Sequence, residues 1–203
     1  SVTSGSFTIS GGGSHTVSRL NLTGGTLNAV DALTVTGSAT LAGTLSGSLT
    51  TQGNSTLTTF NLFGGSWTNE GIATLSSNYI ASSGGANTIT NAAGATFNLN
   101  TSSDFAAFFG LGSGVFNNAG TLNQQASGLH EIHLGSSSQF NNTGLVNVQA
   151  GTLQLGTLGT YTGTFNIASG ATLANSRNFA SPYVFAAGSS ITGNGTFQVA
   201  AGT

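Results

Sequence analysis

The chain has no cysteine, no lysine and a single proline among its 203 residues. Without cysteine it has no disulfide framework, no thiolate metal ligand and no thiol nucleophile. Its only strong cations, Arg19 and Arg177, are too few to neutralise phosphates, so we expect no nucleic-acid partner. No run of about 18 apolar residues is present, which predicts no membrane span. The first residues show no export signal, which we expect to lie outside this sequence or to have been removed.

Charge is scarce, but hydrophobic residues are not. Charged residues make up 3% of the chain and hydrophobic residues 37%, with 13 Phe, 32 Gly and a formal net charge of -2. Disordered segments combine low hydrophobicity with high net charge, so this composition favours a folded chain with a sizeable core. The same mixture of Gly, Ser, Thr, Asn and Leu continues from end to end, which predicts one continuous unit over residues 1–203.

An internal repeat is the most informative feature of the sequence. The phrase FNNAGTL at 116–122 recurs 24 residues later as FNNTGLV at 140–146, and residues 191–197 form a weaker copy. Between the glycine-containing turns, short runs such as 97–99 and 153–155 alternate apolar and polar residues, as strands with one buried face do. Strands of three to five residues are too short for isolated hairpins and suit the coils of a parallel β-helix.

We therefore predict an all-β β-solenoid of about nine coils, each of roughly 20–25 residues. Coils stacked about 4.8 Å apart would make a rod about 40–45 Å long with a continuous core. Inward-facing asparagines at equivalent turn positions, Asn117 with Asn141 and Asn118 with Asn142, are candidates for a hydrogen-bonded ladder. The lone Trp67 occupies an apolar position of the repeat, which favours a place in the core over sugar stacking.

Residues 101–112 break both repeat signatures and are predicted to be an insertion in one coil. A short capped helix is the expected conformation. The side chains of Phe105, Phe108 and Phe109 are expected to cover a gap in the side of the solenoid, and a protruding recognition loop is the alternative.

Residues 140–155 closely resemble a phrase that bacterial exported adhesins repeat, Phe-Asn-Asn-Thr-Gly-x-Val-x-Val-x-x-Gly-Thr-Leu-x-Leu. These proteins are the filamentous-haemagglutinin-like and autotransporter-like adhesins, whose passenger regions carry the phrase. The resemblance implies a right-handed parallel β-helix exposed at the cell surface, and it implies no catalytic residue. We expect a secreted or cell-surface segment that serves as a stiff scaffold for attachment, extracellular assembly or biofilm.

Ionisable side chains are few, and the closest set is His130-Glu131-Ile132-His133. Aligning Ile132 with Leu153 places Ile132 inward. Glu131 and His133 then share the outer face about 7 Å apart. We interpret this pair as a solvated surface patch, with an adventitious metal site and catalysis as alternatives. No enzymatic activity and no cofactor are expected.

The main alternative function is a carbohydrate-binding or polysaccharide-degrading β-helix module, although degradation needs clustered carboxylates in a groove. Ice binding by threonine ranks is disfavoured because the Thr-x-Thr steps are irregular. The last strand, around 197–199, has no capping element and would expose unpaired backbone. Either flanking coils cover it, or subunits stack end to end into a filament. The expected partners are therefore further coils, like subunits, and surface glycans or matrix.

Overall fold

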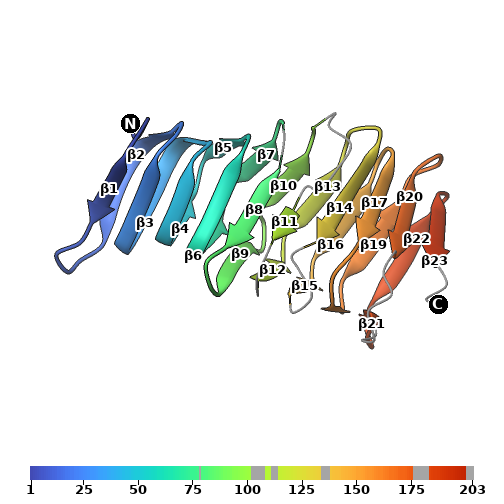
Figure 1. The fold of residues 1–203 in the computed structure, drawn as a ribbon. Coiled ribbons are helices and arrows are strands. Elements are labelled where there is room, and N and C mark those ends of the chain that lie inside the picture. The colour runs from blue at the N-terminus through green and yellow to red at the C-terminus, as the bar shows by residue number, and fades with distance from the viewer. Residues whose placement is uncertain (78, 102–107, 111–113, 134–137, 176–182, 200–203) are drawn as a thin grey trace.

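The computed structural model describes residues 1–203 except 78, 102–107, 111–113, 134–137, 176–182 and 200–203. The chain is an all-β parallel solenoid of about eight turns, close to the predicted nine. No helix occurs among the described residues. The coils stack into a rod that has the chain's first residues at one end and its last at the other (Figure 1). The predicted fold class is confirmed.

The strand pairings are all parallel and form three ladders along the rod. Ladder 1 consists of β1 (Ser6–Ile9), the starts of β3 (Thr26–Leu41), β4 (Thr44–Thr51) and β6 (Phe60–Asn69), then β8 (Ile80–Ser83), β11 (Phe108–Gly110), β14 (Leu129–His133), β17 (Thr152–Leu155), β20 (Thr172–Asn175) and β23 (Thr196–Val199). Ladder 2 consists of the start of β2 (His15–Leu22), the middle of β3, the ends of β4 and β6, then β9 (Asn87–Asn91), β12 (Gly114–Asn118), β15 (Gln139–Asn142), β18 (Gly159–Tyr161) and β21 (Tyr183–Phe185). Ladder 3 consists of the ends of β2 and β3, then β5 (Asn54–Leu57), β7 (Ile72–Leu75), β10 (Thr96–Leu99), β13 (Thr121–Gln124), β16 (Leu145–Val148), β19 (Thr164–Ile167) and β22 (Ser190–Gly193).

The apolar and polar residues that alternate in the sequence are alternately buried and exposed in the strands. In β10, Phe97 and Leu99 are buried while Thr96 and Asn98 are partly exposed, and the same pattern recurs in β13, β16 and β17. A strand directs successive side chains to opposite faces, so every second residue enters the interior. The inward residues of all coils form one hydrophobic core. No coil could shield this surface alone, so each depends on its neighbours.

The core changes character along the rod. Leucine dominates the first coils, whereas a chain of aromatic rings with centroids 5.0–5.9 Å apart runs from Phe60 onward. Its members are Phe60, Trp67, Phe97, Phe116, Phe140, Tyr161, Phe165, Phe185 and Phe197. Tilted and edge-on ring pairs at these separations are favourable. Trp67 is fully buried, which confirms its predicted place in the core.

The recurring turn glycine has a steric cause. A side-chain carbon at Gly144 would overlap the backbone carbonyl oxygen of Gly120 in the preceding coil, and one at Gly163 would overlap that of Gly144. Coils at this spacing therefore leave room only for a hydrogen at this corner.

The predicted insertion at 101–112 is only partly within the described residues. Thr101 is buried, and Phe108–Gly110 form β11, which pairs with β8 and β14. The expected helix is therefore wrong at 108–110, where the backbone satisfies its hydrogen-bonding groups by joining ladder 1. Phe105 lies outside the described residues.

Candidate functional site

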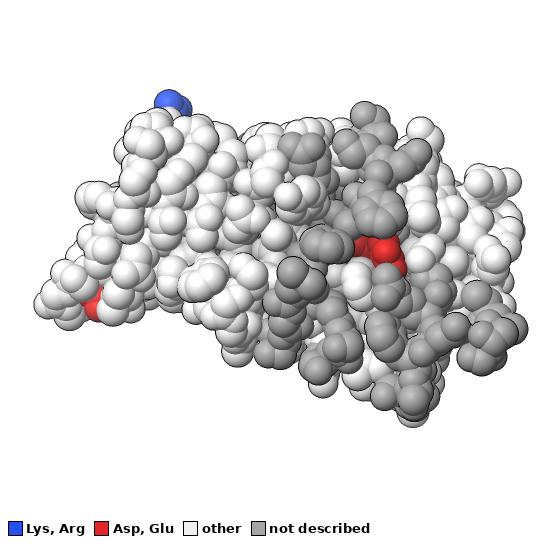
Figure 2. Space-filling model, in the orientation of Figure 1, with Lys and Arg blue, Asp and Glu red and all other residues white. Residues whose placement is uncertain are grey.

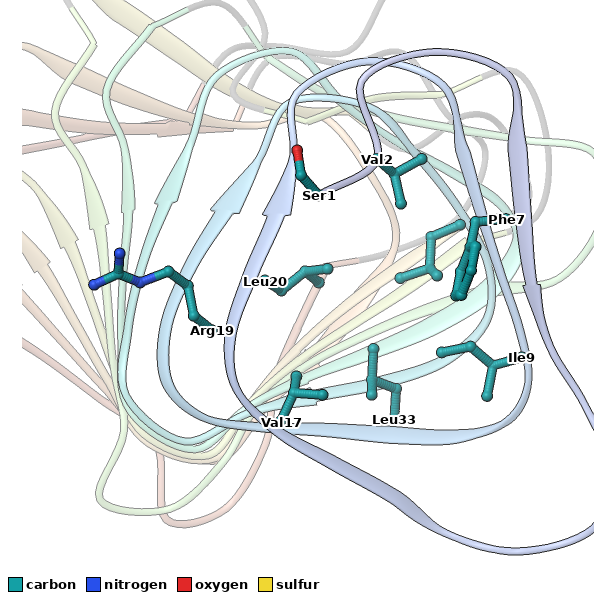
Figure 3. Close-up of a pocket in the computed structure, with 9 residues that line it drawn as sticks. Ser1, Val2, Phe7, Ile9, Val17, Arg19, Leu20 and Leu33 are labelled. Carbon is teal, nitrogen blue, oxygen red and sulfur yellow. The ribbon is translucent and has the colours of Figure 1, made fainter.

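The open N-terminal end of the rod contains a pocket of about 200 Å³, shown in Figure 3. It is lined by Ser1, Val2, Phe7, Ile9, Val17, Arg19, Leu20, Leu27 and Leu33. The apolar members occupy inward positions of the first coils, so the pocket is the uncovered end of the solenoid interior. The Arg19 side chain points away from the pocket (Figure 3), and its Nε donates to the Ser38 Oγ at 3.2 Å. The pocket therefore suits apolar side chains rather than an ion.

The strands around this pocket have unpaired edges. Within the described part of the chain, β1 and the start of β2 pair only with β3, whereas the end of β2 also bridges to Val2, whose amide donates to the Asn21 carbonyl oxygen at 2.7 Å. Phe7 is 56% exposed and Val17 38% exposed, although each lies in register with a buried residue of the next coil. An apolar strand edge is a template for another strand.

A glycine-rich loop joins β1 to β2 and extends from the rod (Figure 1). The Gly12 amide donates to the Asp31 Oδ2 at 2.9 Å, and the His15 Nε2 lies 3.6 Å from the same oxygen. Asp31 thus anchors the loop to the second coil. The partial exposure of both side chains makes the His15–Asp31 pair a weak contributor to stability.

The C-terminal end has the same properties. Among the described residues, β21 pairs only with β18, β22 only with β19, and β23 only with β20. Phe197 is 36% exposed and Val199 65% exposed, again at core-facing positions in register with β20. The first and last coils of the described residues therefore each carry an exposed apolar rung.

A buried asparagine ladder runs through the corner between ladders 2 and 3. The Nδ2 of Asn69 donates to the Oδ1 of Asn91 at 2.9 Å, that of Asn91 to Asn118 at 2.7 Å, and that of Asn118 to Asn142 at 2.8 Å. Each amide also donates to a backbone carbonyl oxygen of the following coil, which lies 3.1 Å away for Asn118. Buried amides are stable only when satisfied in this way.

The second predicted pair behaves differently. Asn141 Nδ2 donates to Asn117 Oδ1 at 3.0 Å, but both side chains are partly exposed and lie on the outer face of ladder 2. The expectation that they point inward was wrong, because adjacent residues of a strand project to opposite faces.

Ladder 3 has a further outer ladder that the repeat phrases did not reveal. Asn123 donates to Asn98 at 2.9 Å, Asn147 to Asn123 at 3.0 Å, and Asn166 to Asn147 at 3.4 Å. The signal was the central asparagine in strands such as 97–99 and 146–148, where it alternates with apolar residues. The result is a preorganised, uncharged row of amides on the outside of the rod.

The structure brings Glu131 and His133 to one residue of the next coil. His133 Nδ1 donates to the Gly156 carbonyl oxygen at 3.0 Å, and a side-chain carbon at Gly156 would overlap the Glu131 Oε1. Gln154 Nε2 lies 3.5 Å from that oxygen. Glu131 is only 6% exposed, so the predicted solvated patch is wrong for this side chain. Within the described residues, no three His, Asp or Glu side chains form a metal-binding cluster.

His130 is a core histidine that the sequence alignment misplaced. The structure pairs His130, not Ile132, with Leu153, and His130 is fully buried. Its Nε2 donates to the Thr101 carbonyl oxygen at 2.9 Å. The Gln124 amide group donates to the Ala126 carbonyl oxygen at 2.9 Å, which orients its other N–H toward His130 Nδ1. These contacts require the Nε2–H tautomer.

The predicted recognition residues are placed only by their backbone. Phe108 and Phe109 lie in β11, in register with Ile132 and His133 of β14. Phe105 is outside the described residues, so no recognition loop is defined.

Large uncharged areas separate the few charged groups on the face shown in Figure 2. Asp31, Glu70 and Glu131 belong to different coils. No helix in the described part of the chain is long and apolar enough to cross a membrane.

No family model matches the chain, and no curated protein or solved structure is significantly similar to it. The class that the geometry defines is therefore the parallel β-solenoid, with open apolar ends and uncharged amide ladders on its sides.

Proposed function

We propose that residues 1–203 are a non-enzymatic structural and adhesive segment of a secreted or cell-surface protein, in which the solenoid is a stiff scaffold. The observation that carries this proposal is the continuity of the three ladders from β1 to β23. Each interior coil is hydrogen-bonded to the coils before and after it on three sides. Bending would have to lengthen those bonds along one side of the rod.

The interior supports stiffness as well. The Asn69–Asn142 ladder fixes the coils that it spans to one another, because a shift of register would leave buried amides without partners. The aromatic chain fills the interior beside it at close ring separations. Together they favour one rigid arrangement over sliding coils.

The surface of the rod favours a binding function over a catalytic one. The described acids lie in separate coils, whereas glycoside cleavage uses two facing carboxyl groups. The outer positions of β10, β13, β17 and β19 present hydroxyl and amide groups, which can bind uncharged surfaces by many weak hydrogen bonds.

Two measurements on purified residues 1–203 test the proposal. Small-angle X-ray scattering is expected to give a rod about 40 Å long per copy, from about eight coils at roughly 4.8 Å. Labelled protein is expected to bind at least one surface in a panel of bacterial cells, matrix proteins and insoluble glycans. Scattering typical of a flexible chain would overturn the proposed role as a stiff scaffold. An absence of binding to every surface in the panel would overturn the proposed adhesive role.

The outer ladder on β10, β13, β16 and β19 favours a second candidate, binding of a neutral glycan along the rod. Its amides are held in place by one another, so little side-chain entropy is lost on binding. Asn98→Ala with Asn147→Ala is expected to abolish glycan-array signals. Thr50→Ala with Thr68→Ala, on ladder 2, is the matched control and is expected to retain them. Equal loss in both variants would rule out this face.

A further inference from the structure

We infer that the outer corner between ladders 1 and 2 carries a stacking platform for a neutral sugar ring, formed by the Phe63 side chain of β6. This inference rests on the proposed adhesive function and deepens it, because it names a ligand class, a hexopyranose, and a place on the side of the rod. The strands that form the site, β6 and β8, are paired with a coil on each side. The platform therefore does not depend on what adjoins the first or the last coil.

Phe63 is an exception in its row of the solenoid. It follows Leu62, whose side chain is fully buried, so the Phe63 side chain projects to the outer face, where it is 53% exposed. The residues that follow the registered ladder 1 positions in neighbouring coils are Asn28, Ser46 and Ser83. The repeat therefore accepts a small or polar residue at this position, and the aromatic ring is not part of the core.

A glycine of the next coil supports the Phe63 ring. A side-chain carbon at Gly84 would overlap three carbon atoms of the ring, so the ring rests directly on the glycine backbone. Gly84 has a φ of 70° and Gly64, which follows Phe63, has a φ of 62°, both in the left-handed region that favours glycine. One side of the ring is thus held by backbone, and the exposed side is free to receive a ligand.

A buried amide fixes this glycine turn. Asn87 is only 3% exposed, and its Nδ2 donates to the carbonyl oxygens of Ser83 at 2.9 Å and Gly85 at 3.0 Å. Its Oδ1 accepts from the Gly65 amide at 3.0 Å, which ties the turn to the corner of β6. The platform is therefore in place before a ligand arrives, which reduces the entropy cost of binding.

Polar groups border the ring on the same outer face. Asn61 precedes Phe63 by two residues in β6, and Ser83 is in register with Phe63 in β8. Strand geometry places their backbones roughly 7 Å and 5 Å from that of Phe63. Both side chains are partly exposed, and within the described part of the chain neither makes a side-chain hydrogen bond. They are available to the hydroxyl groups of a ligand stacked on the ring.

This arrangement matches a hexopyranose of the glucose type. Its equatorial hydroxyls leave C–H bonds on the ring faces, which stack on the electron-rich face of an aromatic ring. Its hydroxyls lie at the rim, where the amide and hydroxyl side chains border the platform. No charged residue occurs in segments 60–69 and 79–87, which favours a neutral ligand.

Saturation-transfer NMR on purified residues 1–203 tests the inference, with methyl β-glucopyranoside as the ligand. Irradiating the aromatic protons of the protein is expected to transfer saturation to the C–H protons of the glucoside, with a dissociation constant in roughly the millimolar range. Glycerol offers hydroxyls without a ring face and is expected to receive no saturation. Choline tests whether the ring instead binds a cation.

Variants assign the signal to the platform. Phe63→Ala is expected to weaken binding about 10-fold or more, and Phe63→Trp is expected to retain it. Gly84→Ala keeps the ring but displaces it, so it is also expected to weaken binding. Ile72→Ala is the matched control, since Ile72 is 49% exposed on the outside of β7, and it is expected to bind normally. Circular dichroism checks that each variant is folded.

The Asn98→Ala with Asn147→Ala variant is expected to keep the transfer, because ladder 3 is a different face and millimolar binding is lost when an array is washed. Unchanged binding in Phe63→Ala, or equal transfer to glycerol, would overturn the inference. Binding of choline in place of the glucoside would overturn the sugar assignment. Rods that bind the surface panel without transfer would reject the platform and keep the proposed function, whereas Phe63-dependent transfer without surface binding would do the reverse.

Discussion

Replacing one buried asparagine by aspartate tests how the inner ladder holds the coils together. In Asn118→Asp, the amide that donates to Asn142 Oδ1 at 2.8 Å and to the Leu145 carbonyl oxygen at 3.1 Å becomes a carboxylate. Only the bond from Asn91 survives, since its Nδ2 still finds an acceptor. Two former hydrogen bonds become contacts between oxygen atoms in a site that is 1% exposed.

The expected loss is about 3–5 kcal/mol of unfolding free energy at pH 7, the cost of a buried charge without a partner. Asn123→Asp is the matched control, because Asn123 also donates to one asparagine and accepts from another. It lies on the outer face, where water replaces the lost bond, so a loss within about 1 kcal/mol is expected. Urea unfolding followed by circular dichroism measures both losses.

The pH dependence gives a second readout. Burial favours the protonated form of the introduced carboxyl, so its pKa in the folded protein is raised above the unfolded value of about 3.9. A protonated carboxyl can donate to Asn142 again. The loss of unfolding free energy in Asn118→Asp should therefore be largest at neutral pH and should shrink as the pH falls toward 4. Equal losses in the two variants, or a loss independent of pH, would refute the assigned role of the ladder.

The remaining predictions concern other buried positions. Gly144→Ala should cost about 1–3 kcal/mol or more in urea unfolding, since the added carbon overlaps backbone of the preceding coil. Burial raises the pKa of the Tyr161 hydroxyl above its usual 10.0, with Tyr183 as a smaller cause. That stabilisation is present below about pH 10 and is lost as the pH rises further, so urea midpoints should fall above pH 10 less steeply in Tyr161→Phe. At pH 7 the same variant should be no less stable, because this hydroxyl has no hydrogen-bond partner among the described residues. Nitrogen-15 NMR should find the Nε2–H tautomer of His130, and Gln124→Leu should weaken that preference without abolishing it, because the Thr101 carbonyl oxygen still accepts from Nε2.

The solenoid fold was predictable because burial in a solenoid follows the alternation of apolar and polar residues within each strand, and this alternation is visible in the sequence. Register was less predictable. The segment 191–197 was aligned with 116–122, yet Ile191 lies in ladder 3 and Phe116 in ladder 2. All three ladders use the same residue types, so a short phrase does not identify its ladder.

Some residues of the candidate sites were predictable from the sequence and others were not. The pairs at Asn118 and Asn142 could be read from a copied phrase, whereas Asn91 precedes its partner Asn118 by 27 residues and escaped a 24-residue repeat. The burial of the Glu131 side chain could not be predicted from the sequence. Its outward position follows from alternation, but its exposure depends on what packs against the outside of the coil.

Coil length varies along the rod and is greatest in its middle part. In ladder 2 the registered residues Leu33 and Leu49 are 16 residues apart, whereas Ile89 and Phe116 are 27 apart. A longer coil encloses a wider interior, which leucine alone would leave with voids. The buried asparagine ladder occupies the coils in which this spacing is 22 to 27 residues, whereas the aromatic rings also continue into a shorter coil, where Asn142 and Tyr161 are 19 residues apart. Phe7 departs from the pattern, since it is the only phenylalanine before Phe60 and belongs to the leucine-rich end.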